Sequence, residues 1–329
     1  MTRRVLITGV TGQDGGYLAE HLLAAGDEVV GTVRATDGAL ERAGLGHLAG
    51  DVRLLPLDLR DPDAVRRTVA TADADEIYHL AAPTFVPDSW DDPTEVTQAI
   101  VTGTAALLAA AGAREGTRVL VASSSEIFGD AGVSPQDESA ATRPRSPYGV
   151  AKLAAHGLVR TLRERHDRHL VSAVTFNHES PRRPERFLPR KVTAGVAAIA
   201  TGRADEITLG DLRAVRDWSH AKDVVAGMVL ALRHETADDY VLASGVPHTV
   251  GDLVDAAFRA AGVERHVTTE SGEPRDRVVV NPAFVRPPER WAPVGDPTRA
   301  REVLGWRPAY TFDALVAEMV AADLERLGS

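Results

Sequence analysis

Short apolar runs alternate with amphipathic stretches along the first half of the chain, in segments such as RVLIT, EVVGTV, EIYHLAA and RVLVASS. A continuous apolar run is typical of a strand that is buried on both faces of a parallel sheet. The stretches between the runs have apolar residues at helical spacing, as in a helix that packs on such a sheet. The alternation therefore predicts an α/β fold with a Rossmann-type, doubly wound parallel sheet.

The regular alternation ends near residue 176, after the segment LVSAVTFN. Beyond this point, polar loops separate short strands and helices that cannot form a second regular sheet of any size. We expect residues 1–176 to form a Rossmann domain, together with a returning segment near 206–240. Residues 177–329 are expected to form mainly a smaller, mixed C-terminal domain that binds the substrate. Ligands of such folds bind at the carboxyl ends of the strands.

A glycine-rich turn follows the first apolar run. Gly9, Gly12 and Gly15 have the spacing G-x-x-G-x-x-G, with a predicted strand before them and an amphipathic helix after them. Such glycines let the backbone approach a pyrophosphate, whose charge is received at the N-terminus of the helix. The pattern therefore favours a dinucleotide site over a glycine turn that binds nothing.

The residue that follows the second predicted strand indicates which dinucleotide is bound. Arg34 stands where NAD enzymes usually carry an acidic residue for the ribose 2′-hydroxyl. Because an arginine can accommodate a 2′-phosphate, we expect the Rossmann domain to bind NADP, with NAD or a solvated surface arginine as the alternatives. Asp58 is a candidate contact to the adenine, and the small side chain of Ala81 leaves room for the cofactor.

Four candidate catalytic residues lie between Ala122 and the end of the segment RSPYGVAK. Ser124 and Glu126 follow a predicted strand, and Tyr148 and Lys152 share one face of a predicted helix. A lysine ammonium beside a phenol favours the phenolate, so we expect Lys152 to lower the pKa of Tyr148 from its free value of about 10. Such a tyrosine can take a proton from a sugar hydroxyl while hydride leaves the carbon. An exposed helix face and a surface glutamate are the alternatives.

The composition restricts the partners of the chain. Its 329 residues carry a net charge of −10 and include no cysteine. The charge argues against nucleic acid or an anionic membrane as a partner, no apolar run reaches membrane-spanning length, and we predict no metal site. We expect a cytoplasmic protein without a signal peptide. An anionic substrate then requires a local basic cluster, and loop residues that could form one are Arg182, Arg183, Lys191, Arg216 and Arg286.

Several longer motifs resemble the GDP-mannose 4,6-dehydratases, a family of extended short-chain dehydrogenase/reductases. The resemblance covers nearly the whole chain and rests on GVTGQDGGYLAE, SSSEIFG, RSPYGVAKL, FNHESPRR, LGDLRAVRDWSHAKDVV and GDPTRAREVLGWRP. FNHESPRR and RDWSHAKD are much more specific than the glycine motif. The resemblance implies an NADP-binding Rossmann domain with a smaller C-terminal domain that binds the nucleotide sugar. It also implies a homodimer, with a tetramer as the alternative.

The resemblance implies a reaction in which each catalytic residue has a part. Tyr148, assisted by Lys152, would take the proton of the sugar C4 hydroxyl while hydride passes from C4 to NADP+. Glu126 would then remove the C5 proton and help water leave from C6, after which the hydride returns to C6. Ser124 would hydrogen-bond to O4 and polarise the 4-ketone.

The resemblance also assigns binding residues by their positions in the motifs. The residues expected around the cofactor are Gly9, Gly12, Gln13, Asp14, Arg34, Asp58 and Leu59. The residues expected to hold the nucleotide diphosphate and its ribose are Asn177, Lys191, Arg216, Arg286 and Glu289.

Three positions depart from the pattern of the family. Ala35 replaces a second arginine, which weakens the expectation of a tetramer, and Ser219 stands where glycine is usual. The segment LAAPTFV, with Phe85, replaces the usual LAAQSHV and changes the polarity of the pocket near the sugar. The identity of the hexose therefore stays open. The alternative functions are a nucleotide-sugar epimerase, a 4-ketoreductase or a non-catalytic NADP-sensing protein.

Overall fold

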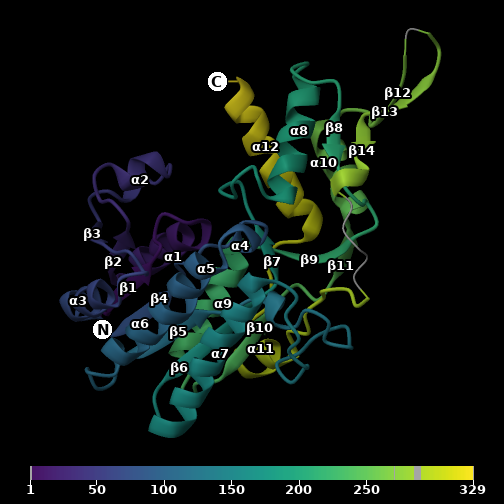
Figure 1. Cartoon of the computed structure of the whole chain (residues 1–329). Coiled ribbons are helices and arrows are strands. Elements are labelled where there is room, and N and C mark those ends of the chain that lie inside the picture. Colours follow the sequence, from purple (N-terminus) through teal and green to yellow (C-terminus); the bar gives the residue numbers. More distant parts are fainter. Residues whose placement is uncertain (1, 270, 285–289, 329) are drawn as a thin grey trace.

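A computed structural model describes residues 2–269, 271–284 and 290–328 of the chain. It consists of a large α/β unit with a smaller lobe at one end of its sheet (Figure 1). The sheet has seven strands in the order β10-β6-β5-β4-β1-β2-β3, and all neighbouring strands are parallel. The strands are β1 (Arg4–Thr8), β2 (Glu28–Val33), β3 (Val52–Pro56), β4 (Glu76–His79), β5 (Arg118–Ala122), β6 (Leu170–Thr175) and β10 (Asp239–Leu242).

Helices cover both faces of this sheet. The helices on one face are α3 (Pro62–Ala72), α5 (Pro93–Thr97), the π-helical segment η2 (Gln98–Thr102), α6 (Gly103–Ala111) and α7 (Pro147–His166), and those on the other are α1 (Gln13–Ala24) and α9 (Ala221–Arg233). Successive side chains of β1 point to opposite faces of the sheet. Val5 and Ile7 pack with α1 and α9, whereas Leu6 packs with α3 and α6. The predicted doubly wound parallel sheet is confirmed.

The smaller lobe contains three helices packed on short strands. Its elements are β7 (Asn177–Glu179), α8 (Leu188–Ala200), β8 (Ile207–Leu209), β9 (Val215–His220), β11 (Pro247–Thr249), α10 (Val250–Ala261), β12 (His266–Thr268), β13 (Pro274–Asp276), β14 (Val278–Val280) and α12 (Phe312–Gly328). The strands form one three-stranded sheet, β11-β9-β7, and the pairs β12-β13 and β14-β8. Residues of α8, α10 and α12 share one apolar core with Trp218 of β9.

The remaining short elements lie in loops between the longer ones. They are α2 (Ala39–Arg42), η1 (Gly46–Leu48), α4 (Asp88–Asp91), η3 (Ser125–Ile127), η4 (Pro282–Phe284) and α11 (Thr298–Val303). The chain leaves the large sheet after β6, forms the first part of the lobe, and returns through α9 and β10 before it completes the lobe. The returning helix and strand place the start of the lobe directly beyond the carboxyl end of β6.

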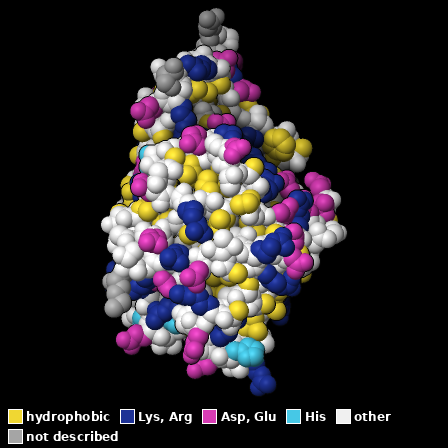
Figure 2. Space-filling view, turned by 90° about the vertical axis from the view of Figure 1, so that its left-hand side faces the viewer, with side chains coloured by type: hydrophobic (Ala, Val, Ile, Leu, Met, Phe, Trp, Pro, Cys, Tyr) yellow, Lys and Arg dark blue, Asp and Glu magenta, His cyan; other side chains and the backbone are white. Residues whose placement is uncertain are grey.

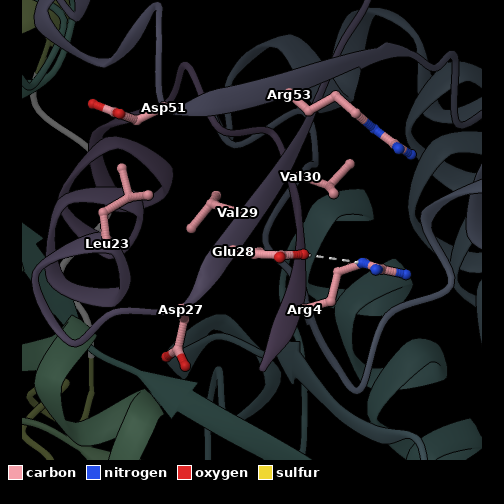
Figure 3. Close-up of a pocket in the computed structure, with 8 residues that line it drawn as sticks. All are labelled: Arg4, Leu23, Asp27, Glu28, Val29, Val30, Asp51 and Arg53. Atoms are coloured by element: carbon pink, nitrogen blue, oxygen red, sulfur yellow. Dashed lines mark hydrogen bonds and ion pairs between the residues drawn. The ribbon is translucent and has the colours of Figure 1, made fainter. Parts of the chain in front are cut away.

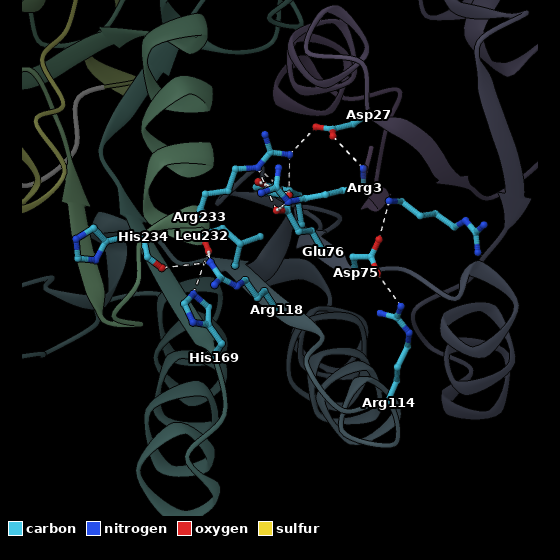
Figure 4. A network of polar contacts seen from close by, with 12 residues as sticks. Arg3, Asp27, Asp75, Glu76, Arg114, Arg118, His169, Leu232, Arg233 and His234 are labelled. Carbon is cyan, nitrogen blue, oxygen red and sulfur yellow. Dashed lines mark hydrogen bonds and ion pairs between the residues drawn. The ribbon is translucent and has the colours of Figure 1, made fainter. Parts of the chain in front are cut away.

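A network of buried ion pairs holds the returning helix at the amino ends of the strands (Figure 4). Arg233, the last residue of α9, contacts Glu76 at 3.0 Å and Asp27 at 2.5 Å. Arg118 donates to the carbonyl of Leu232 at 3.2 Å. Glu76 is only 2% exposed, so its pairing is needed to offset the removal of its charge from water. The network therefore fixes α9 against β4 and β5.

Candidate active site

The glycine turn after β1 is shaped for the close approach of a ligand. Gly9 has a φ of +75°, and a Cβ placed on Gly15 would lie 2.3 Å from the carbonyl oxygen of Gly9. Helix α1 begins at Gln13, and its N-cap, Gly12, has no side chain to bond the first N–H groups. An N-terminus of this kind can receive the charge of a pyrophosphate. The predicted positions Gly9, Gly12 and Gly15 therefore fit a dinucleotide.

The carboxyl end of β5 and the start of α7 bring the candidate catalytic residues together. Ser146 caps α7 by accepting from the N–H of Gly149 at 3.0 Å, and Pro147 occupies the first helical position. Tyr148 therefore lies in the first turn, where its hydroxyl forms a hydrogen bond with Ser124. The Ser146 hydroxyl also donates to Glu126 at 3.3 Å. A phenol, a hydroxyl and a carboxylate thus lie side by side at one edge of the sheet.

Lys152 does not act on Tyr148 as expected from the sequence. Its Nζ donates to the carbonyl of Ala122 at 2.8 Å and lies 5.8 Å from the centre of the Tyr148 ring. Burial raises the pKa of Tyr148 to about 12, although the Ser124 hydrogen bond opposes this shift. Burial also lowers the pKa of Lys152 to about 8. The expected lowering of the Tyr148 pKa by Lys152 is therefore wrong for the protein alone, because burial dominates both groups.

A half-buried pair joins the glycine turn to the start of the smaller lobe. Nε2 of His178, in β7, lies 2.8 Å from Oδ2 of Asp14. Burial raises the pKa of Asp14, but the charge and hydrogen bond of His178 outweigh it and leave that pKa below its usual value. Gln13 strengthens the junction, since it donates to the His178 carbonyl at 3.1 Å and accepts from Ser180 at 2.8 Å.

Sequence reasoning did not assign a function to His178, nor to Ser146. The FNHESPRR motif, which contains His178, is the sequence signal that indicates a role for this residue. Arg183 forms a local ion pair, 3.2 Å from the buried Glu179, and its charge opposes the rise in the pKa of Tyr148. Arg182 instead contacts Glu20 of α1 at 2.6 Å.

The predicted adenosine end of the cofactor site lies at the carboxyl ends of β2 and β3. Arg34 is exposed there, and its charge contributes to the lowering of the Asp58 pKa to about 2. The largest cause of that lowering is a hydrogen bond from Arg60, whose Nη2 lies 2.6 Å from Oδ2 of Asp58. Leu59 is buried, so its side chain is part of the core. Arg34, Arg60 and Asp58 therefore form one charged group at the predicted adenosine end of the cofactor site.

The backbones of the glycine turn and of the loop after β4 pack closely in the middle of the site. A Cβ on Gly9 would lie 3.0 Å from Cα of Ala81, so the two backbones are close. His79 is packed and hydrogen-bonded, as its apolar surroundings predict, with Thr8 at 2.8 Å and Thr104 at 3.1 Å. Burial lowers the pKa of His79 to about 3, so the ring is neutral at pH 7.

The predicted substrate residues come from the smaller lobe. Asn177 in β7 and Arg216 in β9 belong to the same three-stranded sheet. Lys191 is exposed on α8, with its Nζ 5.0 Å from the centre of the Phe284 ring. Arg286 and Glu289 lie outside the described residues. Asn177 lies two residues beyond the end of β6, close to the carboxyl edge of the large sheet.

Comparisons with known proteins agree with this arrangement. Residues 6–319 match the sequence model of the family described as GDP-mannose 4,6 dehydratase. GDP-mannose 4,6 dehydratase 2 of Caenorhabditis elegans is 39% identical over 97% of this chain and 88% of its own length. GDP-mannose 4,6-dehydratase sdnI of Sordaria araneosa is 38% identical over 99% of this chain, which spans 62% of that longer relative. The chain belongs to the GDP-mannose 4,6-dehydratase family.

Solved structures with the same fold also resemble this family member. RMD from Pseudomonas aeruginosa, solved with NADPH, has a TM-score of 0.80 at 26% identity and covers 99% of this chain and 100% of its own. UDP-glucose 4-epimerase from Thermus thermophilus, solved with NAD, has a TM-score of 0.79 at 26% identity over 97% of this chain and 98% of its own. A nicotinamide cofactor is therefore supported, whereas the choice between NADP and NAD is not decided by these structures.

The three positions that depart from the family pattern differ in burial and contacts in this dehydratase family member. Ser219 is 3% exposed, and its hydroxyl has no hydrogen-bond partner among the described residues. Ala35 lies exposed beyond β2. Phe85 is half-buried and packs edge to face on Phe187, which precedes α8 in the smaller lobe. The changed loop after β4 therefore contacts the lobe through an aromatic ring.

Two cavities among the described residues lie away from the catalytic edge. One of about 440 Å³ is at the amino ends of β1 and β2, where Arg4 and Glu28 pair at 3.3 Å (Figure 3). Another of about 820 Å³ lies in the lobe beside Trp218 and Phe312. The residues that line these cavities include none of the predicted catalytic or binding residues.

The described residues contain neither a cluster of metal-ligating side chains nor a membrane-spanning helix. Among these residues, no group of three or more histidine and acidic side chains could hold a metal ion. None of the described helices has the length and apolar character to cross a bilayer. On the face drawn in Figure 2, basic and acidic side chains are interspersed with apolar ones.

Proposed function

We propose that the chain is an NADP-dependent dehydratase that converts GDP-mannose, or a closely related GDP-hexose, to the GDP-4-keto-6-deoxy sugar. The observation that carries this proposal is the grouping of Tyr148, Ser124 and Glu126 at one edge of the sheet, beside the glycine turn. A phenol and a hydroxyl suffice for oxidation at C4. The additional carboxylate supplies the acid and base that the loss of water requires.

The oxidation step uses Tyr148 and Ser124. Tyr148 accepts the proton of the C4 hydroxyl, and the Ser124 hydroxyl holds O4 as the ketone forms. The cofactor, when bound, supplies the acceptor and later the donor of the hydride, and its oxidised ring carries a positive charge that favours the phenolate. Lys152 holds the carbonyl of Ala122, at the end of β5, and so positions the strand that carries Ser124.

The elimination step uses Glu126. Once C4 is a ketone, the C5 proton is acidic, and Glu126 removes it and returns a proton to the departing C6 hydroxyl. Ser146 donates to Glu126 at 3.3 Å and so orients the carboxylate. The hydride then returns to C6, so the reaction has no net oxidation or reduction.

The proposed ligand sites follow the two parts of the fold. Residues 1–176 hold the cofactor, and residues 177–329 hold mainly the GDP-sugar through Asn177, Lys191, Arg216, Arg286 and Glu289. NADP is proposed over NAD because Arg34 is exposed where the ribose 2′-phosphate would lie. Calorimetric titration should give tighter binding of NADP+ than of NAD+, and Arg34→Ala should reduce that difference.

Loss of water from a GDP-sugar is the direct test of the proposed function. Purified protein with GDP-mannose and NADP+ should give a product lighter by one water, with no net change in NADPH absorbance. A 4-ketoreductase would instead consume NADPH, and an epimerase would leave the mass unchanged. A screen of GDP-, dTDP-, UDP- and CDP-hexoses by mass spectrometry identifies the nucleotide, and no turnover with any of them would contradict the proposal.

We also propose that the chain forms a homodimer through helix α7. The exposed face of α7 presents small or apolar residues at helical spacing, namely Val150, Ala154, Gly157 and Thr161. Val150 is 57% exposed, although it lies in the same helix as the catalytic tyrosine. Light scattering should show a dimer that Val150→Arg converts to a monomer, and a tetramer would contradict the proposal. The cytoplasmic location stays a prediction from the sequence.

A further inference from the structure

The loop after β4 contacts the smaller lobe through an aromatic pair. The ring centres of Phe85 and Phe187 are 5.3 Å apart, and their planes are inclined by 84°. This edge-to-face arrangement is a favourable geometry for two aromatic rings. Since Phe85 belongs to the large unit and Phe187 precedes α8, the pair joins the two parts of the molecule. Helix α4, which follows Phe85, lies at the side of the large unit that faces the lobe (Figure 1).

Two arginines hold these rings in place. The guanidinium carbon of Arg186 lies 4.6 Å from the centre of Phe85, and the same side chain contacts Asp88 at 3.0 Å. The guanidinium carbon of Arg183 lies 3.7 Å from the centre of Phe187. Cations over aromatic faces are attracted by the electron-rich face of the ring. The positions of both rings are therefore fixed by charged neighbours as well as by each other.

The loop that carries Phe85 also packs against the cluster of the catalytic tyrosine. Val86, the residue after Phe85, packs in the same apolar cluster as Tyr148. On the other side of the pair, the charge of Arg183 lowers the pKa of Tyr148. Phe85 and Phe187 are each only half-buried, so part of each ring remains accessible. The loop that carries Phe85 therefore packs beside the residue that would hold the sugar.

We propose that Phe85 and Phe187 form an aromatic wall of the hexose subsite and contact the sugar through its C–H groups. The proposal rests on the proposed function, in which C4, C5 and C6 are engaged by Ser124, Tyr148 and Glu126. The wall consequently faces the C2 or C3 side of the hexose. Neither ring has a conventional hydrogen-bond donor or acceptor, so it cannot require a hydroxyl at the carbon that it covers. Phe85 is then a residue that determines substrate specificity.

The wild-type protein provides a first test of the wall. The substrates are GDP-mannose and its 2-deoxy and 3-deoxy analogues, compared by kcat/KM and by the Kd from calorimetry. The kcat/KM and Kd of at least one analogue should stay within about tenfold of the values for GDP-mannose. A site that hydrogen-bonds a hydroxyl would instead reject the analogue that lacks this hydroxyl by about 10⁴-fold. A loss of more than about tenfold in Kd for both analogues would overturn the proposal.

Substitution of Phe85 provides the second test. Phe85→His adds a donor and acceptor to the wall and should raise the preference for GDP-mannose over the tolerated analogue by about tenfold. Phe85→Leu keeps the wall apolar and should leave the preference as in the wild type. Phe312→His is a matched control, because Phe312 stacks on His248 at 3.8 Å in the remote cavity of the lobe. An unchanged preference in Phe85→His overturns the proposal.

The two readouts separate the wall from the reaction itself. Mass spectrometry of the product reports whether water is lost, and so tests the proposed function. The ratio of Kd values reports which sugar the wall accepts, even in a protein that releases no water. Thermal unfolding and NADP+ titration identify any variant that fails to fold, and the wild-type comparison of the three sugars needs no variant at all.

Discussion

The two edges of the seven-stranded sheet hold cations in opposite ways. At the amino edge, burial lowers the pKa of Arg233, but its bonds to Glu76 and Asp27 outweigh the effect and raise that pKa above its usual value. At the carboxyl edge, the ammonium of Lys152 donates to a neutral carbonyl, and burial lowers its pKa to about 8. One cation has opposite charges as partners, whereas the other is held by a dipole.

The difference explains which edge can transfer protons. A buried charge that is neutralised by an opposite charge is fixed, because loss of either partner leaves the other unpaired. A buried group with neutral partners has a shifted pKa and can change its protonation state at moderate pH. The amino edge therefore stabilises the fold, and the carboxyl edge carries the chemistry.

The largest expected effect is a loss of activity on substitution of Tyr148, with a second buried tyrosine, Tyr78, as the control. Tyr148→Phe should lower kcat by about 10³-fold or more, because a positioned proton-transfer group contributes about 10² to 10⁴-fold. Tyr78→Phe is the matched change, since burial also raises the pKa of Tyr78, whose hydroxyl donates to Glu76 at 3.4 Å. Activity of Tyr78→Phe should be unchanged, and NADP+ titration should show that both variants bind the cofactor. Equal loss of activity in the two would contradict the comparison.

The amino edge should show the next largest effect, in stability. Glu76→Gln leaves Arg233 and Arg3 without their shared carboxylate and should lower the free energy of unfolding by about 3 kcal/mol. Urea unfolding at pH 7 measures the loss. Turnover per folded molecule should stay at the wild-type value. A lower turnover in folded Glu76→Gln would show that this edge also takes part in the chemistry.

Glu126 gives a smaller effect that separates the two chemical steps. Glu126→Gln should slow the loss of water by about 100-fold, or about 2.7 kcal/mol, because the base at C5 is lost. Oxidation at C4 should continue, since Tyr148 and Ser124 remain. Stopped-flow absorbance should therefore show NADPH accumulating before any product lighter by one water is detected. Water loss at the wild-type rate would exclude Glu126 as the base.

His79 gives the smallest expected effect, in the pH dependence of stability. Its pKa is about 3 in the folded protein and about 6.5 when unfolded, so the unfolded chain binds the additional proton below pH 6.5. The folded state therefore loses stability as the pH falls, by about 2 kcal/mol between pH 7 and pH 5. Urea unfolding at pH 7 and pH 5 measures this loss of stability. In His79→Gln, the free energy of unfolding should decrease between the two pH values by about 2 kcal/mol less than in the wild type. An equal loss of stability in the wild type and in His79→Gln would contradict the assignment of a neutral, buried His79.

The local elements were largely predictable because each depends on neighbouring residues. β1 (Arg4–Thr8) and β2 (Glu28–Val33) coincide with the apolar runs RVLIT and EVVGTV that predicted strands. α3 begins at Pro62, where Asp61 accepts from the N–H groups of Asp63 and Ala64. Between α5 and α6, by contrast, the helical hydrogen bonding changes to the π-helical η2. Apolar spacing does not indicate such a change in hydrogen bonding.

The candidate site was predictable only in part, because some of its contacts join distant segments. Sequence order places Ser124 and Glu126 after a strand and Tyr148 near a helix start, and the structure brings them together. The contact of Asp14 with His178 joins residues 164 positions apart, and no local pattern indicates it. The same holds for Phe85 and Phe187, which meet only because the lobe packs beside the loop after β4.

The sequence by itself determined the parallel sheet, the dinucleotide turn and the residue types needed for oxidation and elimination. These depend on apolar period, glycine spacing and motifs that are continuous along the chain. Only the tertiary structure decided how the groups are solvated and paired. Burial sets the pKa of Tyr148 to about 12, and Lys152 is held by the carbonyl of Ala122 rather than by the phenol. Burial and pairing depend on the packing of separate elements, so the spacing of Tyr148 and Lys152 alone could not give them.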